Sequence, residues 1–344
     1  MHANTVSNAN SQDESAGRPT PGSPHDAALG AVLGALAGDA AGAVLELQAV
    51  DPTAVEVDRA LTFPGGGVWM VAPGQITDDG ELTMCLLQAI AESNGYSPDH
   101  TACWYGRWYR SDPFDVGAAT RAGLSVAVHQ PEEEQGGLAM LMMTAARANS
   151  MTSKANGSLM RATPLGIWGH RHDDDALAEY ARIDSALTHP NASCTDAVAC
   201  YAIAIAALLR SPGDRGGAFA AARAWADHSA CEEVRSWLDD AEHDRRPPYR
   251  PKMGFVKIAF TEAFRHLLLG TAWERAVRET LLGGGDTDTN ACIVGGLVGA
   301  AVGASGVPEG ALKAVLKAEQ AFGRRRPEWL HPRAAPELVL RLVG

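Results

Sequence analysis

The chain has 344 residues, and 29 lysines and arginines against 41 aspartates and glutamates give a formal net charge of −12 at pH 7. Because 46% of the residues are hydrophobic and 20% are charged, the composition excludes a chain that is disordered throughout. The acidic balance argues against a nucleic-acid-binding protein, which needs a basic face.

The N-terminal segment, residues 1–25, is rich in Asn, Ser, Pro and Gly and contains no apolar run. It lacks the basic-then-apolar order of a signal peptide, so we predict a disordered arm on a cytoplasmic protein. The six cysteines fit no zinc template, which indicates small buried thiols in a reducing compartment. The longest uncharged apolar run, Ala291–Val307, is too short and too rich in Gly to predict a membrane span.

From residue 26 to the end, apolar residues recur at steps of three and four, which is typical of helices, and runs of strand type are almost absent. The sequence therefore predicts an all-α, single-domain helical bundle over residues 26–344. The predicted helices cover 26–48, 79–93, 134–148, 174–187, 191–210, 215–229, 255–269, 271–282, 288–304 and 309–321.

Two of these helices carry glycines at every fourth position. The first has Gly30, Gly34, Gly38 and Gly42, and the second has Gly295, Gly299 and Gly303. Each glycine inside a helix costs about 1 kcal/mol relative to alanine, so the spacing needs a compensating gain. Four-residue spacing places each set along one side of its helix, which predicts two central helices whose backbones approach closely.

Acidic and hydroxyl residues concentrate in two short segments that each precede a helical pattern. These are Gln75–Leu82, with Thr77, Asp78 and Asp79, and Gly283–Asn290, with Asp286, Asp288 and Thr289. Either segment alone fits helix capping better than metal binding, and Asp78 with Glu81 even fits a capping box. Together they offer only oxygen ligands, which suit Mg²⁺, Mn²⁺ or Ca²⁺ and disfavour zinc. If the two segments meet, a pair of cations about 3.5–4 Å apart would relieve the repulsion between their carboxylates.

A third acidic element lies in the first glycine-striped helix. Asp39 and Glu46 are seven residues apart, so both can lie on one side of a continuous helix. They interrupt a stretch that is otherwise uncharged from Ala27 to Val50. Solvated surface charges remain the alternative.

Five motifs in this order resemble the ADP-ribosylglycohydrolase family over about residues 27–322. They are Gly38-Asp39-x-x-Gly42-x-x-x-Glu46, Thr77-Asp78-Asp79, Asn156-Gly157-Ser158-Leu159-Met160-Arg161, Thr188-His189 and Gly285-Asp286-Thr287-Asp288-Thr289. The resemblance implies an orthogonal helical bundle with a central dinuclear Mg²⁺ or Mn²⁺ site. Gly80 and Ala155 depart from the family pattern, which has Thr or Ser and Gly there.

The resemblance also implies roles for individual residues. Asp79 and Glu46 would be catalytic. The metal ligands would be Thr77, Asp78, Asp79, Asp286, Asp288 and Thr289. Substrate would contact Asp115, Gly117, Asn156, Gly157, Ser158, Met160, Arg161, His189 and Phe255. For His189 a structural role, and for Phe255 a core position, remain the alternatives.

The expected activity is the hydrolytic removal of ADP-ribose from a modified protein side chain, with arginine favoured over serine as the attachment site. One alternative is a relative that binds ADP-ribose without turnover. Another is an immunity protein whose arm, residues 1–25, binds a cognate ADP-ribosyltransferase toxin.

Overall fold

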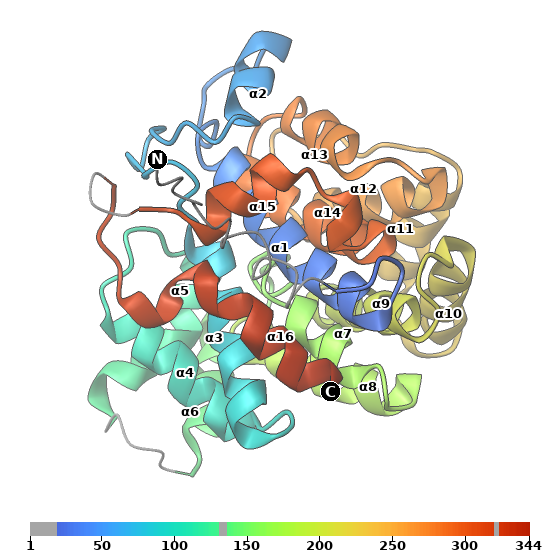
Figure 1. Ribbon diagram of the computed structural model, residues 1–344. Coiled ribbons are helices and arrows are strands. Elements are labelled where there is room, and N and C mark those ends of the chain that lie inside the picture. The colour runs from blue at the N-terminus through green and yellow to red at the C-terminus, as the bar shows by residue number, and fades with distance from the viewer. Residues whose placement is uncertain (1–18, 131–135, 320–322) are drawn as a thin grey trace, which may run out of the picture.

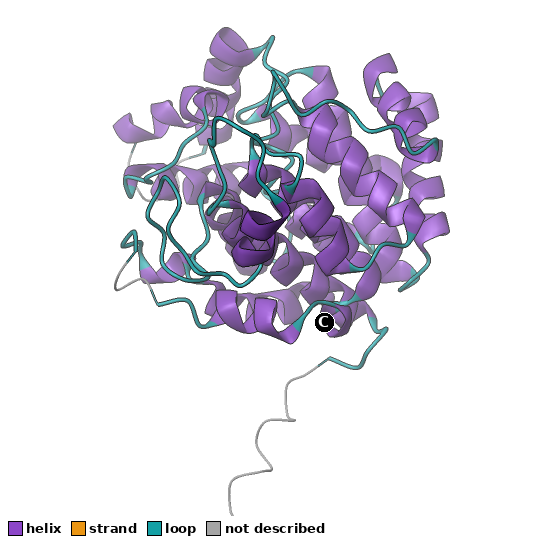
Figure 2. Ribbon diagram, turned by 90° about the horizontal axis from the view of Figure 1, so that it is seen from above, coloured by secondary structure: helices purple, strands orange, loops and turns teal. Residues whose placement is uncertain are grey.

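The computed structural model describes residues 19–130, 136–319 and 323–344, and in these ranges it consists of helices joined by loops, with no strand (Figures 1 and 2). The predicted all-α class is therefore confirmed. The α-helices are α1 (Pro24–Gly42), α2 (Ala54–Ala60), α3 (Asp78–Ser93), α4 (Pro98–Arg110), α5 (Ala118–Leu124), α6 (Leu138–Ser150), α7 (Thr163–Gly169), α8 (Asp174–Ala186), α9 (Ala192–Arg210), α10 (Arg215–Ser229), α11 (Glu232–Glu242), α12 (Val256–Leu269), α13 (Trp273–Leu281), α14 (Thr287–Val302), α15 (Glu309–Leu316) and α16 (Ala335–Val343). Four short 3₁₀ helices join them: η1 (Ser125–His129), η2 (Ala304–Gly306), η3 (Glu328–Leu330) and η4 (Pro332–Ala334).

Helices α1 and α14 pack side by side at the centre of the molecule (Figure 1). A Cβ placed at Gly34 would lie 2.4 Å from the Gly295 carbonyl oxygen, and one at Gly42 would lie 2.4 Å from the Asp288 Cα. The predicted close approach is thus confirmed, and it depends on the absence of a Cβ atom at these glycines. Because Gly42 ends α1 against the start of α14, this packing also brings the segment with Glu46 toward the acidic segment that begins α14.

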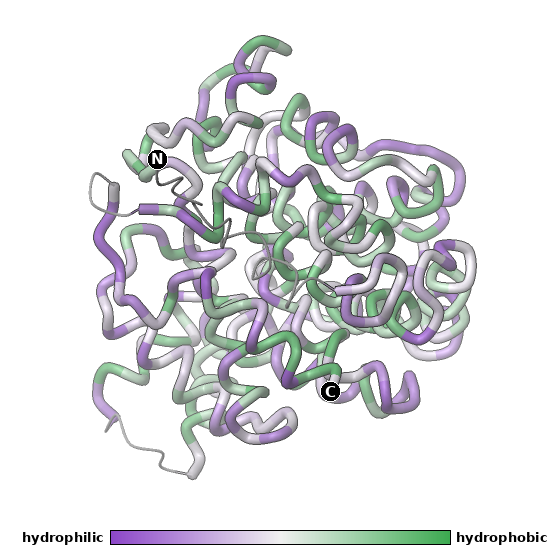
Figure 3. Tube along the Cα trace, viewed as in Figure 1, coloured by the Kyte–Doolittle hydropathy of each residue, from purple (hydrophilic) through white to green (hydrophobic). Residues whose placement is uncertain are grey.

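The apolar residues gather on the inner helices, whereas hydrophilic residues follow the outer turns of the chain (Figure 3). One helix, α9, is long and apolar enough to cross a membrane by length and composition, and 83% of that stretch is buried inside the protein. A buried core helix has the same composition, so this feature does not by itself indicate a membrane span.

The predicted helix over 26–48 is too long. Helix α1 ends at Gly42 and turns follow through Leu47, which has a positive φ of 58°. Asp39 and Glu46 therefore do not share one continuous helix. Residues 1–18 of the predicted arm lie outside the described residues, and α1 begins at Pro24 with the Ser23 hydroxyl capping Asp26.

Candidate metal centre

The two acidic segments lie at the N-terminal ends of α3 and α14, where capping was the alternative. In the structure neither N-cap residue, Thr77 or Asp286, caps its helix with its side chain. The Glu81 carboxylate accepts from Trp108 Nε1 at 2.6 Å and pairs with Arg326 at 2.8 Å instead of closing a capping box. The capping interpretation is therefore wrong, because these side chains are directed elsewhere.

Carboxylates from distant parts of the chain converge. In one group, oxygens of Asp39, Asp79 and Asp288 lie within 4.8 Å of one another. In the other, oxygens of Glu46, Asp286 and Asp288 do so. Asp288 belongs to both groups, so the two clusters form one continuous acidic site between α1, α3 and α14.

Asp39 fixes the start of α3, where Thr77 and Gly80 lie. Its carboxylate is fully buried and accepts hydrogen bonds from the Thr77 amide at 2.9 Å, the Thr77 hydroxyl at 2.7 Å and the Gly80 amide at 2.9 Å. A Cβ at Gly80 would lie 2.6 Å from the Asp39 Oδ2, so the departure from the family pattern at Gly80 fits this contact. Asp39 is a site residue that was not among the predicted ligands or catalytic residues. The signal was a lone charge in an apolar stretch.

The remaining groups fit a pair of divalent cations. The Asp79 Oδ1 is buried without a hydrogen-bond partner, which leaves an anionic oxygen unsatisfied. Burial first, and repulsion between neighbouring carboxylates second, raise the pKa values of Asp78, Asp79 and Asp288 well above their ordinary value. Oxygen-only donors with such repulsion suit hard cations like Mg²⁺ or Mn²⁺.

A cavity of about 240 Å³ opens beside the acidic site. Eleven of the residues predicted for the site line it: Glu46, Asp78, Asp115, Gly117, Asn156, Gly157, Met160, His189, Asp286, Asp288 and Thr289. The wall also includes residues that were not among the predicted site residues: Leu47, Ala118, Ala119, Thr120, Ala155, Met253 and Gly254. Thr77, Asp79, Ser158, Arg161 and Phe255 do not line the cavity.

Asn156 contacts the acidic site directly. Its side-chain amide donates to Asp286 Oδ2 at 2.9 Å, and its backbone amide donates to the Gly254 carbonyl at 3.0 Å. An isolated bridge pairs Ala155 with Phe255 next to these bonds. The pairing fixes the loop before α12 beside the Asn156 loop and orients the Asp286 carboxylate.

Arg161 and Ser158 lie behind the cavity wall. Arg161 is fully buried, pairs with Asp184 at 3.3 Å and donates to the Gly157 carbonyl and the Thr188 hydroxyl. Ser158 accepts from the Ser185 hydroxyl at 2.8 Å. In this structure both residues stabilise the loop that carries Asn156 and Gly157.

His189 and Phe255 have different surroundings. Burial lowers the pKa of His189 to about 3, so the imidazole is neutral, and its Nδ1 lies 2.8 Å from the Thr188 hydroxyl. The Phe255 ring meets the Trp237 ring edge-on with centroids 5.5 Å apart. That contact matches the core alternative for Phe255.

Asp115 and Glu46 supply two further carboxylates to the cavity wall. Burial, with repulsion from Glu46 and Asp286, raises the pKa of Asp115 to about 7. Burial also raises the pKa of Glu46, and the Trp69 indole N–H donates to its Oε2. Both groups therefore hold protons more tightly than exposed carboxyls do.

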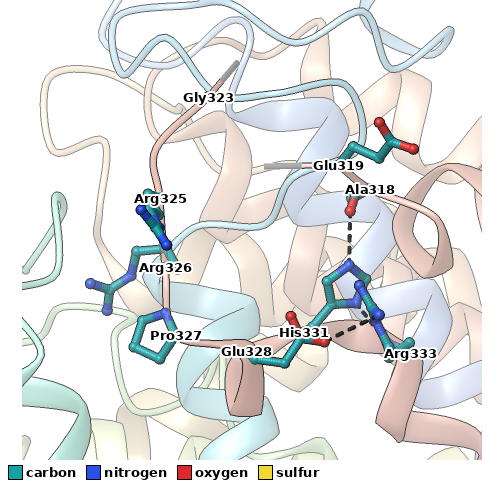
Figure 4. Close-up of a pocket in the computed structure, with 9 residues that line it drawn as sticks. All are labelled: Ala318, Glu319, Gly323, Arg325, Arg326, Pro327, Glu328, His331 and Arg333. Carbon is teal, nitrogen blue, oxygen red and sulfur yellow. Dashed lines mark hydrogen bonds and ion pairs between the residues drawn. The ribbon is translucent and has the colours of Figure 1, made fainter. Parts of the chain in front are cut away.

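A larger cavity, about 800 Å³, lies elsewhere, along the C-terminal segment (Figure 4). His331 Nε2 reaches the Ala318 carbonyl there at 2.8 Å, and Arg333 pairs with Glu328 at 3.2 Å. The described residues that line this cavity include none of the predicted site residues. Two of the lining residues, Glu319 and Gly323, stand on either side of residues 320–322, which the structure does not describe. The acidic cavity is the better candidate because the predicted residues converge there.

The sequence matches one family model, ADP-ribosylglycohydrolase, over residues 20–341. It is 28% identical over 304 residues to the ADP-ribosyl-[dinitrogen reductase] glycohydrolase of Rhodospirillum rubrum, covering 88% of this chain and 94% of the relative. It is 29% identical over 196 residues to the ADP-ribosylarginine hydrolase Tri1 of Pseudomonas putida (strain GB-1), covering 55% of this chain and 47% of the relative.

A solved structure described as an ADP-ribosylglycohydrolase-related protein complex superposes with a TM-score of 0.71 at 26% identity, covering 93% of this chain and 98% of the other. The family match spans nearly the whole chain, and the carboxylates of its expected motifs converge in the structure. This chain therefore belongs to the ADP-ribosylglycohydrolase family, hydrolases that remove ADP-ribose.

Proposed function

We propose that this hydrolase removes ADP-ribose from arginine side chains. The observation that carries the proposal is the charge of the cavity: Glu46, Asp78, Asp115, Asp286 and Asp288 line it, and no described lining residue is Lys or Arg. Two divalent cations would balance the four carboxylates among the ligands proposed below, Asp78, Asp79, Asp286 and Asp288. Glu46 and Asp115 then remain as acidic groups on the wall that faces a cationic guanidinium. A serine linkage presents a neutral leaving group that gains less from this charge.

The metal ligands we propose are Thr77, Asp78, Asp79, Asp286, Asp288 and Thr289. When bound, a pair of Mg²⁺ or Mn²⁺ ions supplies Lewis-acid polarisation of ribose oxygens and of a water. Two further side chains orient these ligands: Asp39 accepts a hydrogen bond from the Thr77 hydroxyl, and Asn156 donates one to Asp286.

Glu46 is the residue we propose for proton transfer to the leaving group or from water. It lines the cavity, whereas Asp79 is completely buried behind the wall. A raised pKa suits a group that exchanges a proton near neutral pH. Asp79, with its unpartnered oxygen, then serves mainly as a metal ligand. Gly117, Gly157 and Met160 shape the wall against which the sugar would lie.

The test is incubation with arginine-linked and serine-linked ADP-ribosylated proteins, with Mg²⁺, with Mn²⁺ and with excess chelator. We expect metal-dependent release of ADP-ribose from arginine and loss of release in Asp286→Ala. Full release in chelator would overturn the metal mechanism, and release from serine alone would overturn the arginine linkage. Calorimetric binding of ADP-ribose without release from any substrate would support the alternative of a binding protein.

We also propose that the protein works in the cytoplasm and that residues 1–25 bind a cognate ADP-ribosyltransferase toxin. Cys85, Cys194, Cys200, Cys231 and Cys292 are free thiols in the structure, which supports a reducing compartment. Deleting residues 1–18 should leave hydrolysis unchanged and weaken binding to such a toxin. Unchanged toxin affinity would remove the partner proposal.

A further inference from the structure

Trp69 lies between the two loops that carry Glu46 and Asp115. Its indole N–H donates to Glu46 Oε2, and its ring lies 6.0 Å from the ring of Phe114, the residue before Asp115. Glu46 follows the end of α1 and precedes Leu47 with its positive φ, so no helix fixes its backbone. Trp69 therefore donates a hydrogen bond to the Glu46 carboxylate from outside the acidic cluster, and this bond orients the carboxylate.

The backbone around Trp69 is itself held in place. Gly66 and Val71 exchange two hydrogen bonds, at 2.8 and 3.0 Å, and close a tight turn with Trp69 inside it. A Cβ at Gly67 would lie 2.4 Å from the Ala43 carbonyl oxygen, so the turn packs directly on the segment that leads to Glu46. These contacts hold the Trp69 backbone beside the segment that leads to Glu46.

Arg324 secures the same turn from the C-terminal part of the chain. Its Nε donates to the Trp69 carbonyl at 2.7 Å, and its guanidinium carbon lies 5.9 Å from the centroid of the Phe114 ring. Gln75, two residues before Thr77, exchanges hydrogen bonds with the Arg324 backbone. Three segments far apart in sequence therefore meet at the Trp69 side chain and backbone.

We propose that Trp69 is a positioning residue that holds the Glu46 carboxylate in its reactive orientation, and that Arg324 holds Trp69. The proposal rests on the proposed role of Glu46 in hydrolysis. Trp69 acts on the reaction only through Glu46. It acts through a single donated hydrogen bond and through the packing of its ring.

The central test is a double-mutant cycle of Trp69→Phe and Glu46→Gln. The Phe variant keeps an aromatic ring, but it removes the N–H donor together with part of the bulk of the indole. We expect Trp69→Phe to lower kcat about tenfold with KM nearly unchanged, and to have little further effect when Glu46 is already Gln. Val68→Ala, an exposed neighbour on the same turn, is the control and should keep wild-type kcat and KM.

A second readout does not depend on hydrolysis. The emission of wild type minus that of Trp69→Phe isolates the Trp69 fluorescence, and this difference should change when Glu46→Gln is introduced in both proteins. Additive kcat effects in the cycle, or a Trp69 emission that ignores Glu46→Gln, would overturn the positioning role. Absence of hydrolysis in wild type with a Trp69 emission that does respond would instead overturn the proposed function.

Discussion

Single polar side chains behind the acidic cluster decide how its carboxylates point. Asp39 receives three hydrogen bonds from the Thr77 and Gly80 region, and Asn156 donates one to Asp286. Neither residue needs to touch a cation to affect its binding. Partners of this kind orient ligand side chains, and their loss commonly weakens metal affinity by about 10–100-fold.

Asn156→Ala removes the donor to Asp286 and leaves that carboxylate free to rotate. We expect the dissociation constant for Mn²⁺, measured by isothermal titration, to rise by about 10-fold or more. The matched control is Asn149→Ala, because Asn149 is exposed on α6 and donates only to the Ala145 carbonyl within its own helix. A Mn²⁺ affinity equal to that of wild type would show that Asn156 does not position Asp286.

The buried ion pair of Glu81 and Arg326 joins α3 to the C-terminal segment. Each side chain is only 3% exposed, and Arg326 also donates to the Ser111 and Asp112 carbonyls. Arg326→Ala would leave Glu81 as an uncompensated buried charge. Such losses cost about 3–5 kcal/mol, so we expect the free energy of unfolding in urea to fall by that amount.

The exposed pair Arg341 and Glu337 on α16 provides the comparison for Arg326→Ala. These side chains are 54% and 75% exposed, and surface pairs on helices contribute about 0.3–0.5 kcal/mol. Arg341→Ala should therefore be nearly neutral. Equal losses of stability in the two variants would contradict the distinction between a buried and a solvated pair.

At the scale of elements, the glycine stripes of α1 and α14 set the spacing of the central helices. Gly34→Ala would place a methyl group 2.4 Å from the Gly295 carbonyl oxygen and 2.9 Å from Trp273 Nε1. Backbone cannot yield as a flexible side chain does, so the helices must separate. We expect a loss of about 1–3 kcal/mol in the free energy of unfolding, measured by urea denaturation.

Gly310→Ala separates this steric effect from helix propensity. Gly310 lies in α15, and a Cβ there would meet nothing within 4 Å. Alanine should gain up to about 1 kcal/mol at such an open helical site. If Gly34→Ala and Gly310→Ala changed the free energy of unfolding in the same direction, the glycine stripe would not act through close packing.

The long periodic helices could be predicted from the sequence, and the short ones could not. Residues 215–229 form α10 as predicted, because about four turns carry enough apolar repeats to reveal the period. The seven-residue helices α5 and α7 span two turns, which is too short for a pattern. The end of α1 was missed because the apolar run continues past Gly42 into turns that tertiary contacts hold.

At the scale of the whole molecule, the candidate site forms only when α1, α3 and α14 are packed. Spacing along the chain cannot show that Asp79 and Asp288 meet, since more than 200 residues separate them. The glycine register did indicate that α1 and α14 pack, and the family motifs indicated which carboxylates belong together. The contacts of Asp39, Trp69 and Arg324 depend on side-chain directions that the sequence pattern does not encode.

This assembly makes the stability of the protein depend jointly on pH and on divalent cations. Burial raises the pKa of Asp39 and of Asp115 to about 7, and raises those of Asp78, Asp79 and Asp288 well above their ordinary value of 3.8. A group with a raised pKa stabilises the fold fully at low pH and loses that contribution as pH rises through its folded pKa. The metal-free protein therefore loses the stabilisation from these groups between about pH 4 and pH 7 or above.

A divalent cation binds the ionised carboxylates, so its stabilising effect should run in the opposite direction. We expect Mn²⁺ to raise Tm strongly at pH 8 and only slightly at pH 5, measured by differential scanning calorimetry. Comparing each pH with and without Mn²⁺ cancels the titration of groups remote from the site, such as His266, whose pKa burial lowers to about 4. Asp286→Ala, scanned at matched ionic strength, should lose most of the shift at pH 8. A shift of equal size at both pH values would mean that the cation does not bind these carboxylates.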